Sequence, residues 1–377
     1  MKAVISSYAR SPFHFAKKGG LATVRPDTLG AAVVQGLLAR TDLDPALIDD
    51  VILGCAYPEA SQGNNLARIV GLLAGLPHGV PGMTVNRFCG SSMQAVHIAA
   101  AQIEAGMGEA FLCVGIESMT MVPQGGFNFS PNPELREHSD AYISMGETAE
   151  NVAQRWNVSR ADQEQLAVDS HRKAAEARAQ GRLRDEIIAI TTDAGQVVDA
   201  DGCIRPTTNL EALAALKPVF RADGVVTAGT SSPLTDGAAA VLVVSDAFAA
   251  RHKLPMLARI KSFASVGVDP AVMGIGPIPA TRKALARAGL SVADLDVVEI
   301  NEAFSSQALA CIRDLGLNPA TVNLDGGGLA IGHPLGATGA RINGKAAALL
   351  LRENGRYALA TQCIGGGQGI ATVLERV

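Results

Sequence analysis

Two stretches of this sequence that lie far apart resemble each other. Residues 39–53, ARTDLDPALIDDVIL, and residues 286–300, ARAGLSVADLDVVEI, share an Ala-Arg pair, a leucine and an Asp-x-Val step into an apolar run. The tripeptide TVN occurs at 84–86 and at 321–323, each time before a glycine-rich turn and a helix of small residues. The offsets of 247 and 237 residues far exceed the ~20 to 50 residues of solenoid or propeller repeats. They predict two similar half-molecules.

Within each half, strand-like apolar runs alternate with helical patterns. The runs are 51–53 and 110–115 in the first half, and 297–300 and 358–364 in the second. This alternation is typical of βαβ-type halves with mostly parallel sheets. Hydrophobic residues make up 48% of the chain and aromatic residues only 4%, which favours close packing of helices on sheets. The sequence therefore predicts an α/β fold.

The segment from residue 118 to 234 has no counterpart in the second half. It is rich in turn residues at first and then contains charged amphipathic helices, one of which we expect from about Arg160 to Gly181 with Ser159 as its N-cap. We interpret the segment as an inserted lid that covers a ligand. The expected division is 1–117 (N-terminal half), 118–234 (inserted lid), 235–255 (return to the N-terminal half) and 256–377 (C-terminal half).

Charge and cysteine content exclude several classes of protein. A net charge of -4 provides no broad basic field for a nucleic acid or an anionic membrane. Six cysteines without paired short spacings resemble neither a disulfide framework nor a zinc site and fit a reducing cytosol. No run approaches the ~20 apolar residues of a membrane span. We expect a cytoplasmic protein with no metal, nucleic-acid or membrane partner.

Cys89 lies in VNRFCGSSMQA, between a strand-like stub and a helix of small residues. At or near a helix N-terminus, unpaired N–H groups and the helix dipole stabilise a thiolate and lower the pKa of a thiol. The position therefore predicts an activated nucleophile. The alternative is a buried cysteine that fills space in the core.

His333 is the one imidazole in GGGLAIGHPLGATGAR. Histidine is the side chain best suited to take a proton from a thiol near neutral pH, and the glycines allow close approach of a ligand or a second catalytic segment. The alternative is a structural histidine in a glycine-rich turn. A phosphate-binding loop is excluded because its glycine and lysine spacing is missing.

Two further motifs follow predicted strands. Cys363 in ATQCIGGGQG ends a strand and precedes three glycines, whose N–H groups can form an oxyanion hole. Asn301 opens NEAF at the carboxyl end of the run LDVVEI, where open α/β sheets bind ligands. Either residue has a plain structural alternative, a buried thiol or a strand-end turn. The remaining cysteines, Cys55, Cys113, Cys203 and Cys311, are predicted to be inert.

Together the four motifs, in this order and spread over the whole chain, resemble the thiolase family. The resemblance implies two duplicated halves that form a five-layered αβαβα core, with an insertion in the N-terminal half. That insertion coincides with the unpaired segment at 118–234.

The resemblance also implies the roles of the site residues. Cys89 would be the nucleophile that becomes acylated, His333 the base that activates it, and Cys363 the acid and base that exchanges a proton with the acetyl-CoA α-carbon. Asn301 would hold a water that forms one oxyanion hole with His333, and the backbone N–H groups of Cys89 and Gly365 would form the other.

Coenzyme A is implied as a co-substrate, with no permanently bound cofactor. The stretch AGTSSPLTDGAAA resembles the family's pantetheine-contacting segment and places Ser232 and Ala228 near the cofactor arm. Arg205 resembles a lid residue beside the nucleotide, where a guanidinium can stack on adenine or pair with phosphate. The remaining residues that we assign to the CoA site are Phe220, Ala303 and Phe304.

One departure bears on the reaction. The acetoacetyl-CoA-forming branch resembles HMG where this chain has SMG at 144–146, which favours the degradative 3-ketoacyl-CoA branch; condensation of two acetyl-CoA remains the alternative. A dinucleotide-dependent oxidoreductase and a catalytically silent acyl-CoA carrier are more distant alternatives. Ketoacyl synthases have no second cysteine like that of CIGGGQG. The family resemblance further implies a homodimer or a homotetramer.

Overall fold

A computed structural model describes all 377 residues. Nine of its strands form one continuous path in the order β10-β11-β12-β9-β1-β8-β5-β3-β4, and β2 (His14–Phe15) pairs with β8 beside this path. The strands of the N-terminal half are β1 (Ala3–Arg10), β3 (Asp50–Gly54), β4 (Gly82–Val85), β5 (Ala110–Ser118) and β8 (Thr235–Ser245). Those of the C-terminal half are β9 (Ala258–Gly267), β10 (Val297–Ile300), β11 (Tyr357–Ile364) and β12 (Gln368–Glu375).

The two half-sheets join through a short antiparallel contact of β1 with β9, in which Val4 pairs with Arg259. The prediction of mostly parallel sheets is wrong. Only the pairs β3–β4, β3–β5 and β10–β11 are parallel, whereas β8 and β12 return antiparallel to their neighbours. The sequence pattern missed this because a strand buried on both faces is continuously apolar whichever way its neighbour runs.

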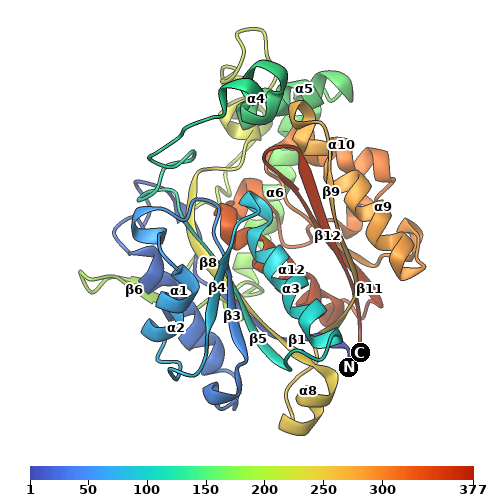
Figure 1. The fold of residues 1–377 in the computed structure, drawn as a ribbon. Coiled ribbons are helices and arrows are strands. Elements are labelled where there is room, and N and C mark those ends of the chain that lie inside the picture. Colours follow the sequence, from blue (N-terminus) through green and yellow to red (C-terminus); the bar gives the residue numbers. More distant parts are fainter.

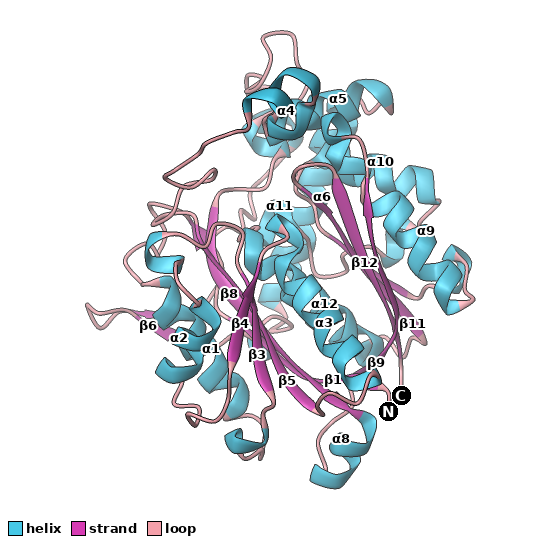
Figure 2. Ribbon diagram, viewed as in Figure 1, coloured by secondary structure: helices cyan, strands magenta, loops and turns pink.

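Helices complete the five layers (Figures 1 and 2). α3 (Ser91–Glu104) and α12 (Leu335–Arg352) lie between the two half-sheets and share the largest hydrophobic cluster with both. α1 (Pro26–Leu38) and α2 (Leu66–Leu73) cover the outer face of the N-terminal half-sheet. α9 (Pro277–Ala288) and α10 (Ser305–Leu315) cover the outer face of the C-terminal one.

The two segments that repeat in the sequence also occupy equivalent positions in the structure. β4 runs parallel to β3, with Gly54 opposite Val85, and leads into α3. In the second half Val322 forms a parallel bridge with Val298 of β10 and leads towards α12. The two TVN tripeptides thus occupy equivalent places, each beside the first parallel strand of its half and before a central helix.

Small residues allow the central helix α12 to approach the N-terminal sheet closely. A Cβ atom added at Gly339 would overlap the backbone nitrogen of Met93, and one at Gly336 would overlap the carbonyl oxygen of Ile116. A glycine is also required at position 115, because a Cβ there would overlap the carbonyl of Gly336. The glycine-rich segment therefore sets the separation between α12, α3 and β5.

The inserted segment carries α4 (Pro133–His138), α5 (Met145–Arg155), α6 (Arg160–Ala179), α7 (Leu210–Ala214) and the small sheet of β6 (Ile190–Thr191) and β7 (Val197–Val198). Ser159 caps α6 by accepting from the Asp162 N–H, and Gly181 follows the helix at φ 74°, so the predicted helix is confirmed. α4 and α5 lie at the end of the molecule opposite the two termini (Figure 1).

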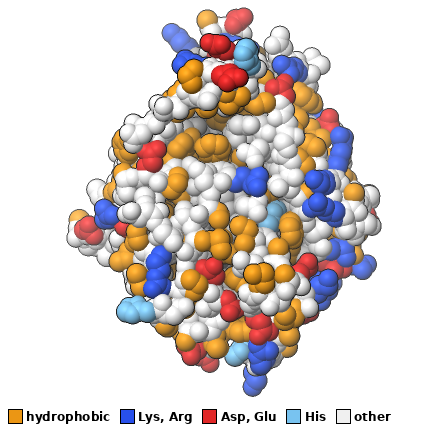
Figure 3. Space-filling model, in the orientation of Figure 1, with side chains coloured by type: hydrophobic (Ala, Val, Ile, Leu, Met, Phe, Trp, Pro, Cys, Tyr) orange, Lys and Arg blue, Asp and Glu red, His pale blue; other side chains and the backbone are white.

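Two shorter helices complete the chain, α8 (Asp246–His252) and α11 (Gly328–Ile331). No helix is both long and apolar enough to cross a bilayer. The face seen in Figure 3 mixes acidic, basic and apolar side chains, with Lys and Arg most frequent along the edge formed by α9. That face has no extended basic field of the kind that nucleic acids require.

Candidate active site

Cys89 lies at the junction that its sequence predicted. The residues after β4 form a 3₁₀ turn, Phe88–Gly90, and α3 begins at Ser91. The left-handed φ of Phe88, 42°, turns the chain sharply before the cysteine. Cys89 is half-buried, whereas the other five cysteines are buried, and all six are free thiols. The sulfur lies within hydrogen-bonding range of the Gly365 N–H, which approaches from the second half of the molecule.

The pKa of Cys89 contradicts the prediction that its helix position would lower it. Burial raises the pKa to about 11, and the negative charge of Glu117 adds to the rise. The N–H groups of Gly365 and Cys89 act in the opposite direction without cancelling the loss of hydration. The resting side chain is therefore a neutral thiol that needs a base to react.

His333 is placed just before α12 by two contacts, which involve its backbone N–H and its Nδ1. Its N–H donates to the Thr235 hydroxyl over 3.1 Å, and its Nδ1 lies 2.5 Å from the Thr338 hydroxyl. Because that hydroxyl donates to the Pro334 carbonyl over 3.1 Å, it accepts from Nδ1, and Nε2 keeps its lone pair. Burial lowers the pKa of His333 to about 3, with a further contribution from Arg341. The imidazole is neutral, and the Nε2 lone pair, which faces the Asn301 amide, is the position that can take a proton.

Asn301 emerges at the carboxyl end of β10, as predicted. Its N–H donates to the Thr361 carbonyl over 3.0 Å, which fixes it beside β11. The amide Nδ2 lies 3.2 Å from His333 Nε2, whereas Oδ1 is buried and has no hydrogen-bond partner in the protein. An amide beside the imidazole can orient a water or a developing oxyanion.

Cys363 lies near the end of β11 and is fully buried. Burial raises the pKa of its thiol well above the usual range, and the charge of a Cys89 thiolate raises it further. Cys89 and Cys311 are both near enough for a charge on either sulfur to raise the pKa of Cys363. The thiol is therefore protonated at rest and holds a proton that it can donate to the strongly basic carbanion.

Gly365 completes the approach of β11 to Cys89. A Cβ atom at this position would lie 3.3 Å from the sulfur of Met145, so a side chain would crowd the space in front of the thiol. The backbone carbonyl of Cys89 accepts a hydrogen bond from the Gln362 side chain. The structure thus shows Cys89 beside Gly365 and Asn301 in contact with His333. The hydrogen bond from the Asn301 N–H to Thr361 places the second group beside β11, two residues before Cys363.

The predicted CoA contacts fall into two groups. The Ser232 N–H donates to the Ala303 carbonyl over 2.9 Å, and the Phe304 ring meets the Phe220 ring edge-on with centroids 6.1 Å apart. Ala303 and Phe304 also belong to the apolar cluster that contains Cys363. These four residues therefore lie in and beside the apolar cluster that contains Cys363.

Arg205 and Ala228 form the second group. Both are exposed on the inserted segment. Arg205 contacts His171 of α6 through its backbone N–H, 3.1 Å from Nδ1, and through its guanidinium, 3.2 Å from Nε2. No contact in the structure joins these two residues to the catalytic group.

Several residues of the site were not predicted from the sequence. Thr338 lies in GATGAR, five residues after His333. The hydroxyl at this spacing, near the start of the following helix, is the sequence feature that could have identified it as the partner of the imidazole. The Glu117 carboxylate accepts from the N–H groups of Ala56 and Gly336, 2.8 and 2.9 Å away, and so ties the two halves together under the site. Ser144, which stands where the acetoacetyl-CoA branch has a histidine, caps α5.

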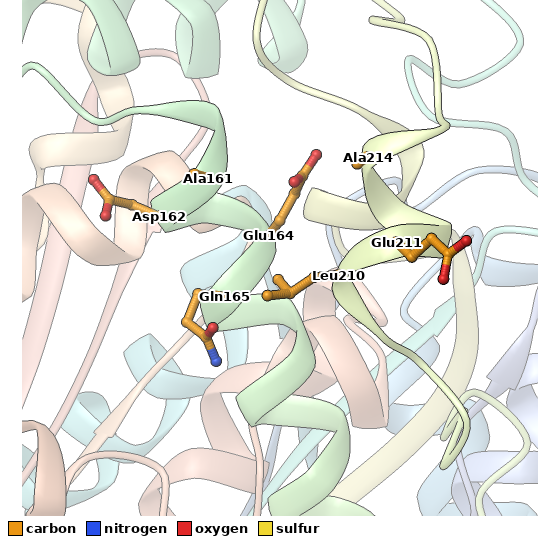
Figure 4. Close-up of a pocket in the computed structure, with 7 residues that line it drawn as sticks. All are labelled: Ala161, Asp162, Glu164, Gln165, Leu210, Glu211 and Ala214. Carbon is orange, nitrogen blue, oxygen red and sulfur yellow. The ribbon is translucent and has the colours of Figure 1, made fainter.

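A cavity of about 540 Å³ lies elsewhere, between α6 and α7 (Figure 4). Its acidic lining residues, Asp162, Glu164 and Glu211, come from these two helices, and the first two already pair with Arg313 and Arg160. None of the predicted site residues lines it. No group of three or more His, Cys, Asp or Glu side chains is arranged to hold a metal ion.

Comparison with known proteins places these observations in a family. The profile of the thiolase N-terminal domain matches residues 3–247 and that of the thiolase C-terminal domain matches residues 254–376. The 3-ketoacyl-CoA thiolase of Saccharophagus degradans is 49% identical over 385 residues, which cover 99% of this chain and 98% of that protein. That of Bacillus subtilis is 46% identical over 387 residues, 99% of either chain.

Solved structures with a similar fold are also thiolases. Human mitochondrial 3-ketoacyl-CoA thiolase superposes with a TM-score of 0.92 at 37% identity, covering 100% of this chain and 99% of that one. A structure of the human mitochondrial enzyme in complex with CoA gives the same TM-score at 36% identity, with coverages of 100% and 98%. The chain belongs to the thiolase family.

Proposed function

We propose that this protein is a degradative thiolase that cleaves a 3-oxoacyl-CoA with CoA to give acetyl-CoA and a shortened acyl-CoA. The observation that carries the proposal is that Cys89 of one half lies beside Gly365 at the end of β11. Asn301 and His333 of the same second half are in contact beside β11, the strand that carries Cys363. The names of the relatives, 3-ketoacyl-CoA thiolase, support the degradative direction.

In the first half-reaction His333 Nε2 takes the proton of the Cys89 thiol, and the sulfur attacks the C3 carbonyl of the substrate. Since the pKa of the thiol is about 11 and that of the imidazole about 3, a stable ion pair does not form in the resting enzyme. Proton transfer and attack are therefore coupled. Donors beside the site, among them the N–H of Gly365, stabilise the developing oxyanion.

Collapse of the tetrahedral adduct breaks the C2–C3 bond and leaves an acyl group on Cys89. The electron pair passes to C2 of the departing acetyl-CoA, where the Cys363 thiol supplies the proton. In the second half-reaction the thiol of CoA gives its proton to the Cys363 thiolate and attacks the acyl group. Cys89 then leaves as a thiolate and recovers its proton from His333. This is covalent catalysis with a ping-pong order.

CoA is a co-substrate in this scheme, and no permanently bound cofactor or metal takes part. The human mitochondrial relative has been solved in complex with CoA, which supports CoA binding here. We assign Ser232, Ala303, Phe304 and Phe220 to the pantetheine arm and Ala228 and Arg205 to its outer end. The inserted segment 118–234 acts as the cover of this site, between the N-terminal half (1–117 with 235–255) and the C-terminal half (256–377).

Assembly and location belong to the same proposal. We propose a homodimer or homotetramer, since β4 lies at the edge of the ten-stranded sheet with one side unpaired. Six free cysteines support a reducing compartment, the cytoplasm. A thiolase family member has no need of NAD(H), so the oxidoreductase alternative has no support.

The test is a thiolysis assay on purified protein with 3-oxoacyl-CoA substrates from four carbons to long or ring-bearing acyl groups. We expect acetyl-CoA release with a preference beyond four carbons and no activity in Cys89→Ala. Preference for condensing two acetyl-CoA would instead support the biosynthetic alternative. Absence of an acyl adduct on Cys89 during turnover would support the silent carrier.

A further inference from the structure

A buried ion pair, in addition to the contact of Asn301 with His333, joins β10 to α12. Glu299 lies on β10, two residues before Asn301, and Arg341 lies on α12, eight residues after His333. Arg341 Nη2 is 3.2 Å from Glu299 Oε2, and the side chains are 1% and 0% exposed. The proposed reaction does not use this ion pair.

The alternation of β10 explains why Glu299 and Asn301 meet α12. Val298 and Ile300 point into the outer cluster beneath α9 and α10, whereas Val297 belongs to the cluster between the two half-sheets. Residues two apart on a strand share a face. Glu299 and Asn301 therefore both point into the central layer, where α12 lies.

The other charges near the pair are already matched. Lys345, one turn further along α12, binds Glu186 at 2.9 Å and Asp325 at 2.7 Å. Arg10 of β1 binds Glu186 at 2.8 Å and Asp201 at 2.6 Å. The remaining titratable groups near the pair are the Tyr8 phenol of β1 and the His333 imidazole, both buried.

Arg341 and Glu299 form no ion pair with any other residue. No polar atom of either side chain forms a hydrogen bond, not even with the other residue of the pair, so the 3.2 Å ion-pair contact is their one polar interaction. Separating a buried ion pair leaves uncompensated charges in a medium of low polarity, which is strongly destabilising. The pair therefore resists any movement of β10 away from α12.

We infer that Glu299 and Arg341 are positioning residues whose buried ion pair keeps Asn301 against His333. Two contacts of 3.2 Å link β10 and the residue after it to α12 and the loop before it. One joins Glu299 to Arg341, and the other joins Asn301 to His333. Neither charged residue touches the substrate; both act through the amide and the imidazole. The inference rests on the thiolase reaction proposed above.

The first experiment compares Arg341→Met, which keeps the length of the side chain, with Arg341→Lys, which keeps the charge. We expect kcat for thiolysis per alkylatable Cys89 to fall about 10- to 100-fold in Arg341→Met with KM for CoA unchanged, because small displacements of catalytic groups cost rates of this order. Arg341→Lys retains most of the activity. A purely structural pair would lower the yield of folded protein and leave kcat per active site unchanged.

Glu299→Gln, which keeps the shape of the side chain, and the double variant Glu299→Gln/Arg341→Met complete a double-mutant cycle. If the two residues act as one unit, the double variant loses no more activity than the weaker single variant. Arg352→Met is the control: another arginine of α12 with a buried carboxylate partner, Asp325 at 2.6 Å, whose loss we expect to lower stability and leave kcat unchanged. Glu299→Gln also keeps the test possible if Arg341→Met fails to fold.

Wild-type kcat in folded Arg341→Met and Glu299→Gln, or losses that multiply in the double variant, would overturn the inference. A wild-type protein without thiolase activity would instead overturn the proposed function. In that case crystal structures decide about the pair, since we expect the separation of Asn301 Nδ2 from His333 Nε2 to widen beyond 3.2 Å in Glu299→Gln. An unchanged separation would refute the positioning role.

Discussion

Asn301 and His333 are in direct contact, with the amide Nδ2 3.2 Å from the imidazole Nε2. The two residues come from different elements of the C-terminal half, the end of β10 and the loop before α12. Their contact, together with the approach of β11 to Cys89, assembles the site from both half-molecules. Each part of the site can be tested separately.

The Thr338 hydroxyl should fix the tautomer of His333. In Thr338→Val the acceptor for Nδ1–H is lost, so the proton is free to move to Nε2 and block the base. We expect kcat to fall about 10²-fold, the lower range for loss of general-base catalysis, with KM changed little. Thr338→Ser is the matched control and should keep most of the activity. Equal rates in the Val and Ser variants would contradict the assigned tautomer.

Cys89 should react with iodoacetamide as a thiol with a raised pKa. Because only the thiolate reacts and the pKa is raised to about 11, the rate should climb about tenfold per pH unit between pH 7 and 9.5. A cysteine with a lowered pKa would reach a plateau below pH 8. The measurement is the rate of alkylation by mass spectrometry, with Cys89→Ala to identify the site.

Cys363→Ala should separate the deprotonation of Cys89 from the protonation of the departing acetyl-CoA. The variant lacks the acid that protonates the departing acetyl-CoA, so we expect thiolysis to fall about 10²- to 10⁴-fold. Alkylation of Cys89 should persist at a similar rate, because the Cys363 thiol holds its proton and adds no charge beside Cys89. Loss of alkylation would show that Cys363 controls the position or reactivity of the Cys89 thiol and does not act as an acid.

Gly339→Ala should disturb the central layer. Its Cβ would overlap the backbone nitrogen of Met93, which cannot rotate away. Overpacking of this kind costs about 1–3 kcal/mol or more, and α12 should move together with His333. Gly79→Ala, at a position with no atom within 4 Å and no left-handed φ, is the control and should match the wild type. The free energy of unfolding and kcat are the quantities to compare.

Arg10 should anchor the inserted segment. Its guanidinium binds Asp201 through two nitrogens at 2.6 and 2.8 Å and Glu186 at 2.8 Å, all buried. In Arg10→Ala Asp201 loses its charged partner and Glu186 keeps only Lys345, which costs about 3–5 kcal/mol. We expect a lower melting temperature and faster proteolysis within 184–202. If proteolysis rates match the wild type, the ion pairs do not hold this segment.

The sequence by itself determined more of the protein than its composition suggests. The repeat at 39–53 and 286–300, together with the unpaired segment, predicted two halves and an insertion. The motifs around Cys89, Asn301, His333 and Cys363 identified the family, because their chemistry and order depend on residue type alone. A left-handed φ or a close approach admits few residues besides glycine, which makes such motifs recognisable.

Only the tertiary structure decided the pKa of Cys89 and the direction of the strands. The helix N-terminus that the sequence predicted is present, but desolvation is a property of everything packed around the sulfur, and here it is the larger effect. Antiparallel pairing of β8 and β12 depends on how the chain returns to the sheet. The pairing of Glu299 with Arg341 likewise arises only when β10 and α12 are side by side, because no local pattern links residues 42 positions apart.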